Sequence, residues 1–264
     1  MEKILTMNEY IIKLDSIIFA LILLGFVLVY LMEQNQKKQF QNKLFRLLVF
    51  SVIVMLVIEI PYLLINGNAR WARFIFILKS VYHVLKIIPL IIYVLLVDSV
   101  IFNNKIHTKH TLWLWLPYIV LTMALSLLNF IFPLFFTVDT TGTYQQLRFI
   151  PVLFALQYIP ILAVIRLLIA KRHRLDKKQL YLFWFIPVPV FIVSLFQLFE
   201  SKLALTWPFV SLGIVGLGLA MQQKRLTEDY LTGAYNRQHL DAYLEHKLRN
   251  CKPNKTFAAF LIDV

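Results

Sequence analysis

The sequence has few charged residues, and acidic residues are especially scarce. Asp, Glu, Lys and Arg make up 16% of the 264 residues, whereas soluble domains carry about 25%. Basic residues outnumber acidic ones by 27 to 14, for a formal net charge of +13. The single cysteine, Cys251, excludes a disulfide framework within the chain. We find no internal repeat, which argues against a transporter built from repeated halves.

Apolar residues are correspondingly abundant and occur in long blocks. They make up 59% of the chain, and the mean hydropathy is +0.71. A helix that crosses a bilayer needs roughly 17–25 mostly apolar residues. We expect an all-α multi-pass membrane bundle over residues 1–221, with Pro187 and Pro189 kinking its sixth helix. The seven expected spans are approximately 11–32, 44–65, 74–101, 112–136, 149–170, 180–199 and 203–221.

Basic residues lie mainly in alternate connections between these spans. They are concentrated in residues 33–43, 102–111 and 171–179 and after residue 221, and they are fewer in the other connections. Loops rich in Lys and Arg stay on the cytoplasmic side of a membrane. We therefore expect a cell-membrane protein with its N-terminus outside and its C-terminus in the cytoplasm. This placement accounts for the positive charge, and no nucleic-acid partner is expected.

A group of four ionisable residues lies within the second and third expected spans. Lys79, His83 and Lys86 have the spacing of one helix face, and Glu59 lies at a similar depth on the preceding span. An unpaired charge there costs at least about 2.5–3.5 kcal/mol, so we expect Glu59 to pair with Lys79 or His83. Two interpretations stay open. The group forms a pocket for a small anionic ligand or a proton sensor at His83, or it only joins helices, with Lys79 reaching the membrane surface.

Five further polar residues have expected roles in or near the bilayer. Asn129, Gln157 and Gln197 are expected to form hydrogen bonds between helices. Asp98 and Arg166 lie close to the cytoplasmic ends of their spans, and we expect both side chains to extend to the interface.

The last expected span ends in small residues and then a polar connector. Gly216 and Ala220 are four residues apart, which lets another helix approach closely. The pair fits packing within the bundle or a homodimer face. Residues 222–228 contain no Pro or Gly, so we expect the helix to continue through them as a connector into the cytoplasm.

Residues 229–264 have the pattern of a soluble α/β segment. Asn236 is a good N-cap, and the apolar residues between 237 and 249 have helical spacing. After a loop, the nearly continuous apolar run 256–264 predicts a strand buried on both faces. Asp263 lies at the end of this strand, where open α/β sheets bind ligands.

The beginning of this segment resembles the opening of a GGDEF-type diguanylate cyclase domain. The family pattern D-x-L-T-G-x-x-N-R is matched at six positions, and Ala234 replaces the usual Leu. The resemblance covers only residues 229–264, the first part of such a domain. It implies that Asp263 corresponds to the first metal-binding Asp, which holds Mg²⁺ against the phosphates of GTP together with a second acidic residue. The matching residues are Asp229, Leu231, Thr232, Gly233, Asn236 and Arg237.

The resemblance implies a membrane sensor that regulates the synthesis of cyclic di-GMP from GTP, working as a homodimer because the family joins two GTP molecules held by two subunits. The 264 residues contain no G-G-D/E-E-F turn after the motif. We therefore expect this segment to be an incomplete domain without cyclase activity and without tight binding of Mg²⁺ or GTP. The alternative is a stand-alone seven-span binding or transport protein, in which the motif is a coincidence. The DNA beyond codon 264 distinguishes the two.

Overall fold

The computed structural model describes residues 2–33, 40–175, 177–199 and 206–227, together with five helical residues near the C-terminus. By its internal contacts the chain divides into two units, Met1–Gly218 and Leu219–Val264. Asp263 and all six positions of the cyclase-like motif except Arg237 lie outside the described residues. The five helical residues are Arg237, Leu240, Asp241, Tyr243 and Leu244.

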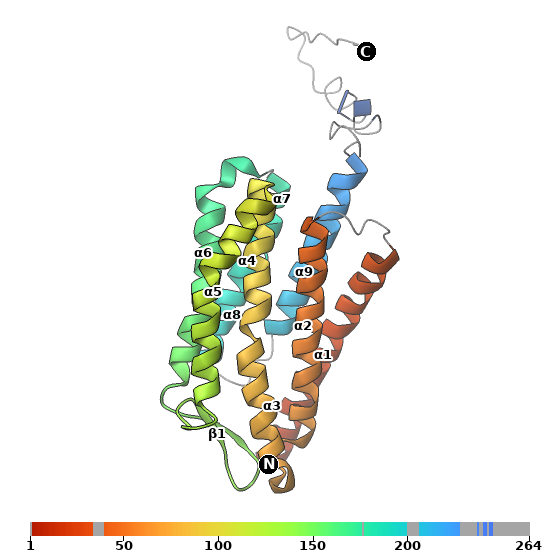
Figure 1. Cartoon of the computed structure of the whole chain (residues 1–264). Helices are drawn as coiled ribbons and strands as arrows, with labels where there is room; N and C mark the ends of the chain where they lie inside the picture. Colours follow the sequence, from red (N-terminus) through yellow and green to blue (C-terminus); the bar gives the residue numbers. More distant parts are fainter. Residues whose placement is uncertain are drawn as a thin grey trace. The chain divides into compact units, whose positions relative to one another are not determined.

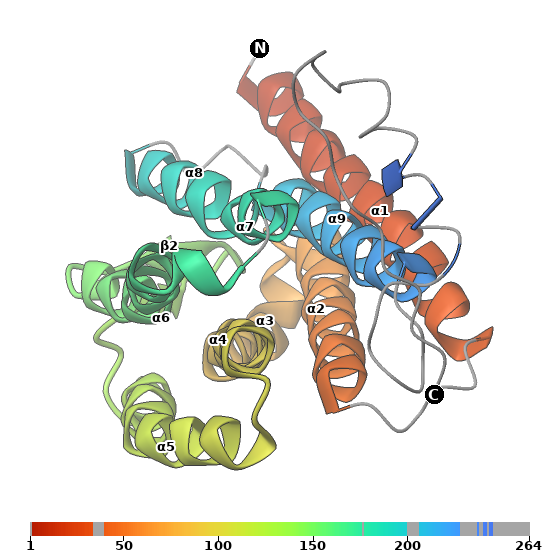
Figure 2. The same ribbon diagram turned by 90° about the horizontal axis from the view of Figure 1, so that it is seen from above.

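The first unit is a helical bundle with one small hairpin (Figure 1). Helix α4 contacts α2, α5 and α6, and α1 packs on α2 (Figure 2). Two short 3-10 turns, η1 (Ala69–Trp71) and η2 (Arg172–Arg174), join helices. The helices are α1 (Glu2–Glu33), α2 (Phe40–Ile65), α3 (Ala72–Leu85), α4 (Ile87–Phe102), α5 (Lys105–Leu128), α6 (Ile150–Ala170), α7 (Lys177–Trp184), α8 (Pro187–Phe199) and α9 (Thr206–Thr227).

Within the described residues, five helical segments are long and apolar enough to cross a membrane. They account for the first five expected spans. The sixth and seventh are represented by shorter apolar helices, Gln179–Val193 and Thr206–Leu219. The count of seven spans therefore stays a prediction. The five segments are Ile11–Leu31, Phe40–Ile65, Ala69–Phe102, Lys105–Leu128 and Ile150–Ala170.

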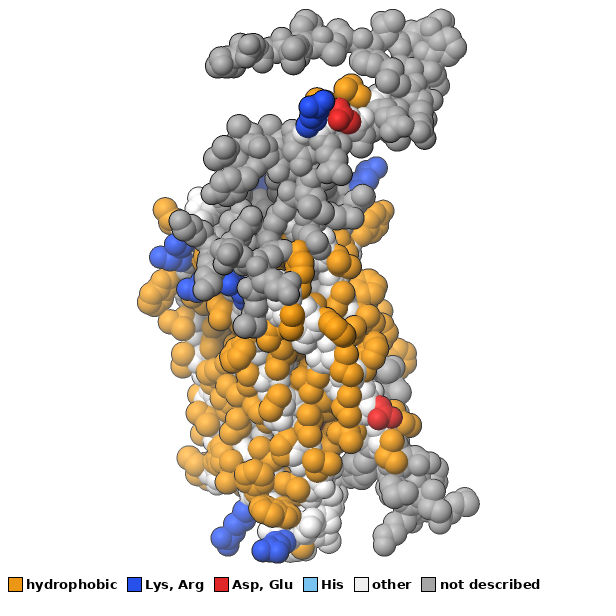
Figure 3. Space-filling view, turned by 90° about the vertical axis from the view of Figure 1, so that its right-hand side faces the viewer, with side chains coloured by type: hydrophobic (Ala, Val, Ile, Leu, Met, Phe, Trp, Pro, Cys, Tyr) orange, Lys and Arg blue, Asp and Glu red, His pale blue; other side chains and the backbone are white. Residues whose placement is uncertain are grey.

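Large apolar side chains cover the outward faces of these helices. Phe26, Trp113 and Leu114 are each at least 68% exposed. In Figure 3 hydrophobic side chains cover the middle of the visible face, and Lys and Arg side chains appear toward its ends. Apolar surface of this extent marks contact with lipid or with other proteins. Combined with the length of the helices, it supports a membrane protein.

The third expected span is one apolar segment that breaks at Lys86. Helix α3 ends at Leu85 and α4 begins at Ile87. Pro89 has no N–H to donate to the carbonyl four residues earlier, which belongs to Leu85, and its ring crowds that carbonyl. The N–H of Lys86 still donates to the carbonyl of Tyr82 at 3.0 Å. The break therefore places Lys86 at a junction between two helices.

The predicted end of the fourth span, 112–136, is wrong, and its helix begins before the predicted start. Helix α5 begins earlier, at Lys105, because the side chain of Asn104 accepts hydrogen bonds from the N–H groups of Ile106 and His107. It ends earlier, at Leu128. Pro133 disfavours helical backbone at the residue before it, so the apolar run does not continue as a helix.

The residues after α5 form a hairpin, and the side chain of Asn129 supports it through hydrogen bonds. Strand β1 (Phe136–Val138) pairs antiparallel with β2 (Tyr144–Gln146). Asn129 accepts from the N–H of Phe135 at 2.9 Å and donates to the carbonyl of Phe136 at 3.0 Å. The expectation that Asn129 joins two membrane helices is therefore wrong. It follows the end of α5 and holds the chain as it turns back.

The tip of the hairpin is a turn held by Asp139. The side chain of Asp139 accepts from the N–H groups of Thr141 and Thr143, both at 2.9 Å. The hydrogen bond from the Thr141 hydroxyl is the main reason that the pKa of Asp139 lies below its ordinary value. Gly142 has φ of 82°, and a Cβ there would lie 2.3 Å from the carbonyl oxygen of Asn68. Only glycine fits this contact between the hairpin and the α2–α3 connection.

The sixth expected span is interrupted where its prolines predicted a kink. Helix α7 ends at Trp184 and α8 begins at Pro187, a first helical position at which the missing N–H of proline carries no cost. Facing this junction, a Cβ on Gly213 of α9 would lie 2.2 Å from Ile186, and one on Gly216 would lie 3.2 Å from Leu182. Gly216 is therefore used in packing within the chain.

Candidate functional site

An ion pair between α2 and α3 forms the centre of the candidate site. The Nζ atom of Lys79 lies 2.9 Å from Oε1 of Glu59, and the two side chains are 9% and 16% exposed. Of the two predicted partners of Glu59, Lys79 and His83, the structure shows the pair with Lys79. A charge-assisted hydrogen bond of this length offsets part of the cost of removing both charges from water.

Aromatic rings surround the Lys79 ammonium group. Its Nζ lies 3.3 Å from the ring centroid of Tyr62, 5.0 Å from that of Tyr82 and 5.4 Å from that of Tyr144. Ring faces attract a cation at these distances. Lys79 is buried, so the interpretation in which it extends to the membrane surface is wrong.

His83 lies one helical turn beyond Lys79 and contacts the hairpin. Its ring stacks on Phe136 with 5.0 Å between centroids, and Nε2 lies 3.4 Å from the Tyr144 hydroxyl. The other ring nitrogen, Nδ1, is buried and has no hydrogen-bond partner in the described part of the chain. A hollow of about 10 Å³ adjoins His83, which is close to the room that one water molecule needs.

Tyr144 closes this cluster from the hairpin, and sequence reasoning missed it. Its ring meets that of Tyr62 edge to face, with 6.2 Å between centroids. Its N–H donates to the side chain of Asn66 at 3.2 Å, which fixes β2 against the end of α2. Burial, and after it the nearby Glu59 carboxylate, raise the pKa of the Tyr144 hydroxyl, which stays neutral. No spacing in the sequence relates Tyr144 to Glu59.

Lys86 is placed differently from the other three predicted residues. Its Nζ lies 5.3 Å from the ring centroid of Phe154 and 5.8 Å from that of Tyr82. Among the described residues it has no carboxylate within ion-pair distance. Lys86 instead lines a cavity of about 90 Å³. The structure thus brings Glu59, Lys79 and His83 together, whereas Lys86 faces a separate cavity.

Gln157 belongs to the walls of two spaces. It lines both the Lys86 cavity and the small hollow beside His83. Its predicted role was a hydrogen bond between helices, and the structure adds that its side chain is within reach of whatever occupies either space. Gln197, which had the same predicted role, has no described side chain.

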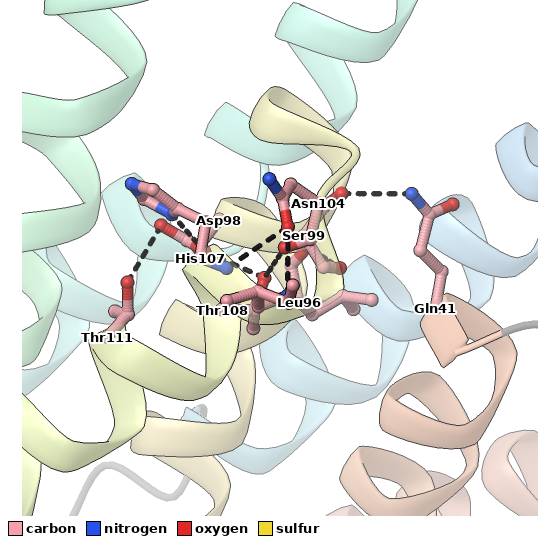
Figure 4. A network of polar contacts seen from close by, with 9 residues as sticks. Gln41, Leu96, Asp98, Ser99, Asn104, His107, Thr108 and Thr111 are labelled. Carbon is pink, nitrogen blue, oxygen red and sulfur yellow. Dashed lines mark hydrogen bonds and ion pairs between the residues drawn. The ribbon is translucent and has the colours of Figure 1, made fainter.

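A second polar network lies at the connection between α4 and α5 (Figure 4). Asp98 is only 3% exposed, so the expectation that it extends to the membrane interface is wrong. Its carboxylate accepts from the hydroxyls of Thr108 at 2.8 Å and Thr111 at 3.2 Å, and Nδ1 of His107 lies 3.2 Å away. The tight turn after α4, with Asn103 in the left-handed region, brings these three side chains over Asp98.

The same end of the bundle is tied to α2. Gln41 donates to the carbonyl of Ser99 at 3.0 Å (Figure 4). The ring of His107 stacks on Phe102 with 4.0 Å between centroids. Three helices are therefore joined by polar and aromatic contacts at this point.

In the part of the chain that the structure describes, no group of three or more His, Cys, Asp or Glu residues could hold a metal ion. Asp263, the residue that the resemblance assigns to Mg²⁺, lies outside that part. No family model matches the chain, and no curated protein or solved structure matches it. A functional assignment therefore depends on the residues themselves.

Proposed function

We propose that this chain is the membrane sensor region of a signalling protein of the GGDEF-type diguanylate cyclase family. The observation that carries the proposal is the order of segments near the C-terminus. Helix α9 begins as an apolar helix at Thr206 and continues to Thr227, and the motif that resembles the cyclase opening begins at Asp229. The chain thus passes from the bundle into the motif after a single intervening residue.

In this proposal the bundle crosses the cell membrane seven times, with α7 and α8 together forming the sixth span and α9 the seventh. The N-terminus is outside, and the basic connections at 102–111 and 171–179 face the cytoplasm. Glu59 and Lys79 then lie in the outer half of the membrane. Buried ionisable groups within membrane spans usually mark functional sites, so this cluster is the proposed place where a stimulus acts.

The output follows from the resemblance alone. A change in the bundle would move α9 and alter how two cyclase domains meet in a homodimer. Each domain would hold Mg²⁺ and GTP with the help of Asp263, because Mg²⁺ prefers hard oxygen ligands and completes its shell with phosphate. Because Gly216 packs against Leu182 within the chain, it does not favour a dimer through this part of α9.

The proposal is tested with the complete reading frame that contains these residues. Sequencing beyond codon 264 is expected to show an in-frame G-G-D/E-E-F turn, and expression in cells without cyclases of their own is expected to produce cyclic di-GMP.

Asp263→Asn should abolish the product because it removes a ligand of the metal. Asp241→Asn, at an exposed helical position, is the matched control and should leave the product unchanged. A stop codon in place of the turn, or no cyclic di-GMP from the complete frame, would refute it.

A further inference from the structure

The cavity beside Lys86 has apolar walls and a few polar groups. It lies between α2, α4, α6 and α9 and the junction of α7 with α8, entirely within the first unit. Most of the wall is apolar, with Leu48, Leu90, Ile161 and Val210 as examples. Its volume is about 90 Å³, smaller than the dry engineered cavity of about 150 Å³ that accepts benzene. The space suits a small molecule with an apolar body.

The wall also holds polar groups, among them one lysine and three hydroxyls. Lys86 is the only charged side chain among the described residues that line the cavity. The hydroxyls of Tyr158 and Thr206 are buried and have no hydrogen-bond partner in the described ranges. Tyr93 also lines the cavity, but its hydroxyl donates to the carbonyl of Phe183 at 2.7 Å. Buried polar groups are normally satisfied, so the two hydroxyls call for a partner, and the half-buried Lys86 has no carboxylate within ion-pair distance among the described residues.

We propose that this cavity binds a small carboxylate that carries a short apolar chain. The carboxylate would lie against the Lys86 ammonium and accept hydrogen bonds from Tyr158 and Thr206, and the apolar chain would contact the remaining walls. One lysine balances one negative charge, which favours a monoanion over a doubly charged phosphate. Glu59 does not serve as this partner, because its carboxylate pairs with Lys79 and is not within ion-pair distance of Lys86.

The binding site does not depend on the cyclase proposal and would stand in a separate binding protein as well. In a sensor, its position gives the ligand a route to the output. The cavity wall includes Thr206, Trp207 and Ile214 of α9. A bound ligand would therefore contact the helix that leads to the motif. Tyr82 contacts Trp207 edge to face, with 6.4 Å between centroids, and lies 5.0 Å from Nζ of Lys79. The cavity is therefore coupled by contact to the Glu59–Lys79 cluster.

The test uses the full chain in lipid nanodiscs and the fluorescence of Trp207. Bromohexanoate carries a heavy atom that quenches a nearby indole, and bromohexanol is its neutral match. We expect saturable quenching by bromohexanoate, with bromohexanol binding at least about tenfold more weakly because it lacks the charged hydrogen bond. Trp207→Phe should remove the saturable component. Equal affinity for the acid and the alcohol in the wild-type chain would overturn the proposal without any variant.

Lys86→Met is the decisive variant, and Lys109→Met, at an exposed position on α5, is its control. Lys86→Met should lose the preference for the acid, and Lys109→Met should keep it, with both variants checked for helical content and melting temperature. If Lys86→Met does not fold, Thr206→Val replaces it, with a weaker preference for the acid expected. Competition by unlabelled hexanoate is expected, and equally strong competition by palmitate would contradict the short chain that the cavity volume requires. Competition by neither acid, or an unchanged preference in the folded variant, would contradict the proposal.

Discussion

At the scale of single residues, the buried pair of Glu59 and Lys79 explains how a chain with so few acidic residues can keep a charge among apolar helices. The ammonium group is held by one carboxylate oxygen and three tyrosine rings. The second oxygen, Oε2, is buried and has no hydrogen-bond partner among the described residues. The stability of each buried charge therefore depends on the other charge, because neither side chain has enough other partners to replace it.

Removing one member of this pair should cost more than removing both. Glu59→Leu leaves a buried ammonium group without its counterion, and we expect the free energy of unfolding to fall by about 3–5 kcal/mol. The double variant Glu59→Leu with Lys79→Met removes both charges, so most of this loss should be recovered. Chemical unfolding in detergent, followed by helical content, measures both. Equal destabilisation by the single and double variants would show that the charges do not depend on one another.

At the scale of elements, the Asp98 network holds the beginning of α5 against the end of α4. Thr108 is 1% exposed and makes the shorter bond to Asp98, 2.8 Å, while Thr111 is less buried and bonds at 3.2 Å. Asp98→Leu would leave Thr111 and His107 without this acceptor and would leave the Thr108 hydroxyl with only the carbonyl of Asn104, at 3.2 Å. A polar group buried without a partner costs about 1–3 kcal/mol.

The two threonines provide a graded test of this network. Asp98→Leu is expected to lower the free energy of unfolding by about 1–3 kcal/mol, Thr108→Val by less and Thr111→Val by least. The comparison of Thr108→Val with Thr111→Val controls for the loss of a hydroxyl on the same helix. Thermal unfolding followed by circular dichroism gives the order. If Thr111→Val were as harmful as Asp98→Leu, the burial and bond lengths at Asp98 would not explain its role.

Elements that are set by the local sequence pattern could be predicted. Elements that depend on the chain folding back onto distant residues could not. Helix α6 agrees with its predicted span to within one residue, because Ile150–Ala170 is a single apolar block. The run 112–136 is also apolar, but hydropathy does not distinguish a membrane helix from an apolar segment that turns back at the end of the bundle. Asn104 as an N-cap and Pro133 as a helix breaker were the available signals for its true bounds.

The candidate site shows the same division. The pairing of Glu59 with Lys79 could be predicted because sequential antiparallel spans place residues of equal depth side by side. Tyr144 could not, because it reaches the cluster through a hairpin whose docking depends on Asn66 and Gly142. The burial of Asp98 was also missed, since its hydrogen-bond donors come from across a turn.

At the scale of the whole molecule, the two polar clusters lie toward opposite ends of the first unit. Figure 1 shows the β1 hairpin at one end and the connection between α4 and α5 at the other. The aromatic and ionic cluster contacts the hairpin through Tyr144, while the Asp98 network adjoins the basic residues Lys105 and Lys109. In the proposed orientation, which follows the positive-inside rule, the hairpin lies outside the cell and the Asp98 network lies on the cytoplasmic side.

This orientation can be measured because the chain has only one natural cysteine. In a Cys251→Ser background, a cysteine at Thr140 in the exposed hairpin should react with a membrane-impermeant maleimide in intact cells, because the proposed orientation places the hairpin outside. A cysteine at Lys109, also exposed, should react only after the membrane is opened. Labelling after opening is the control for reactivity at both positions. The opposite pattern in intact cells would reverse the orientation, remove the cyclase-like motif from the GTP of the cytoplasm and so refute the proposed function.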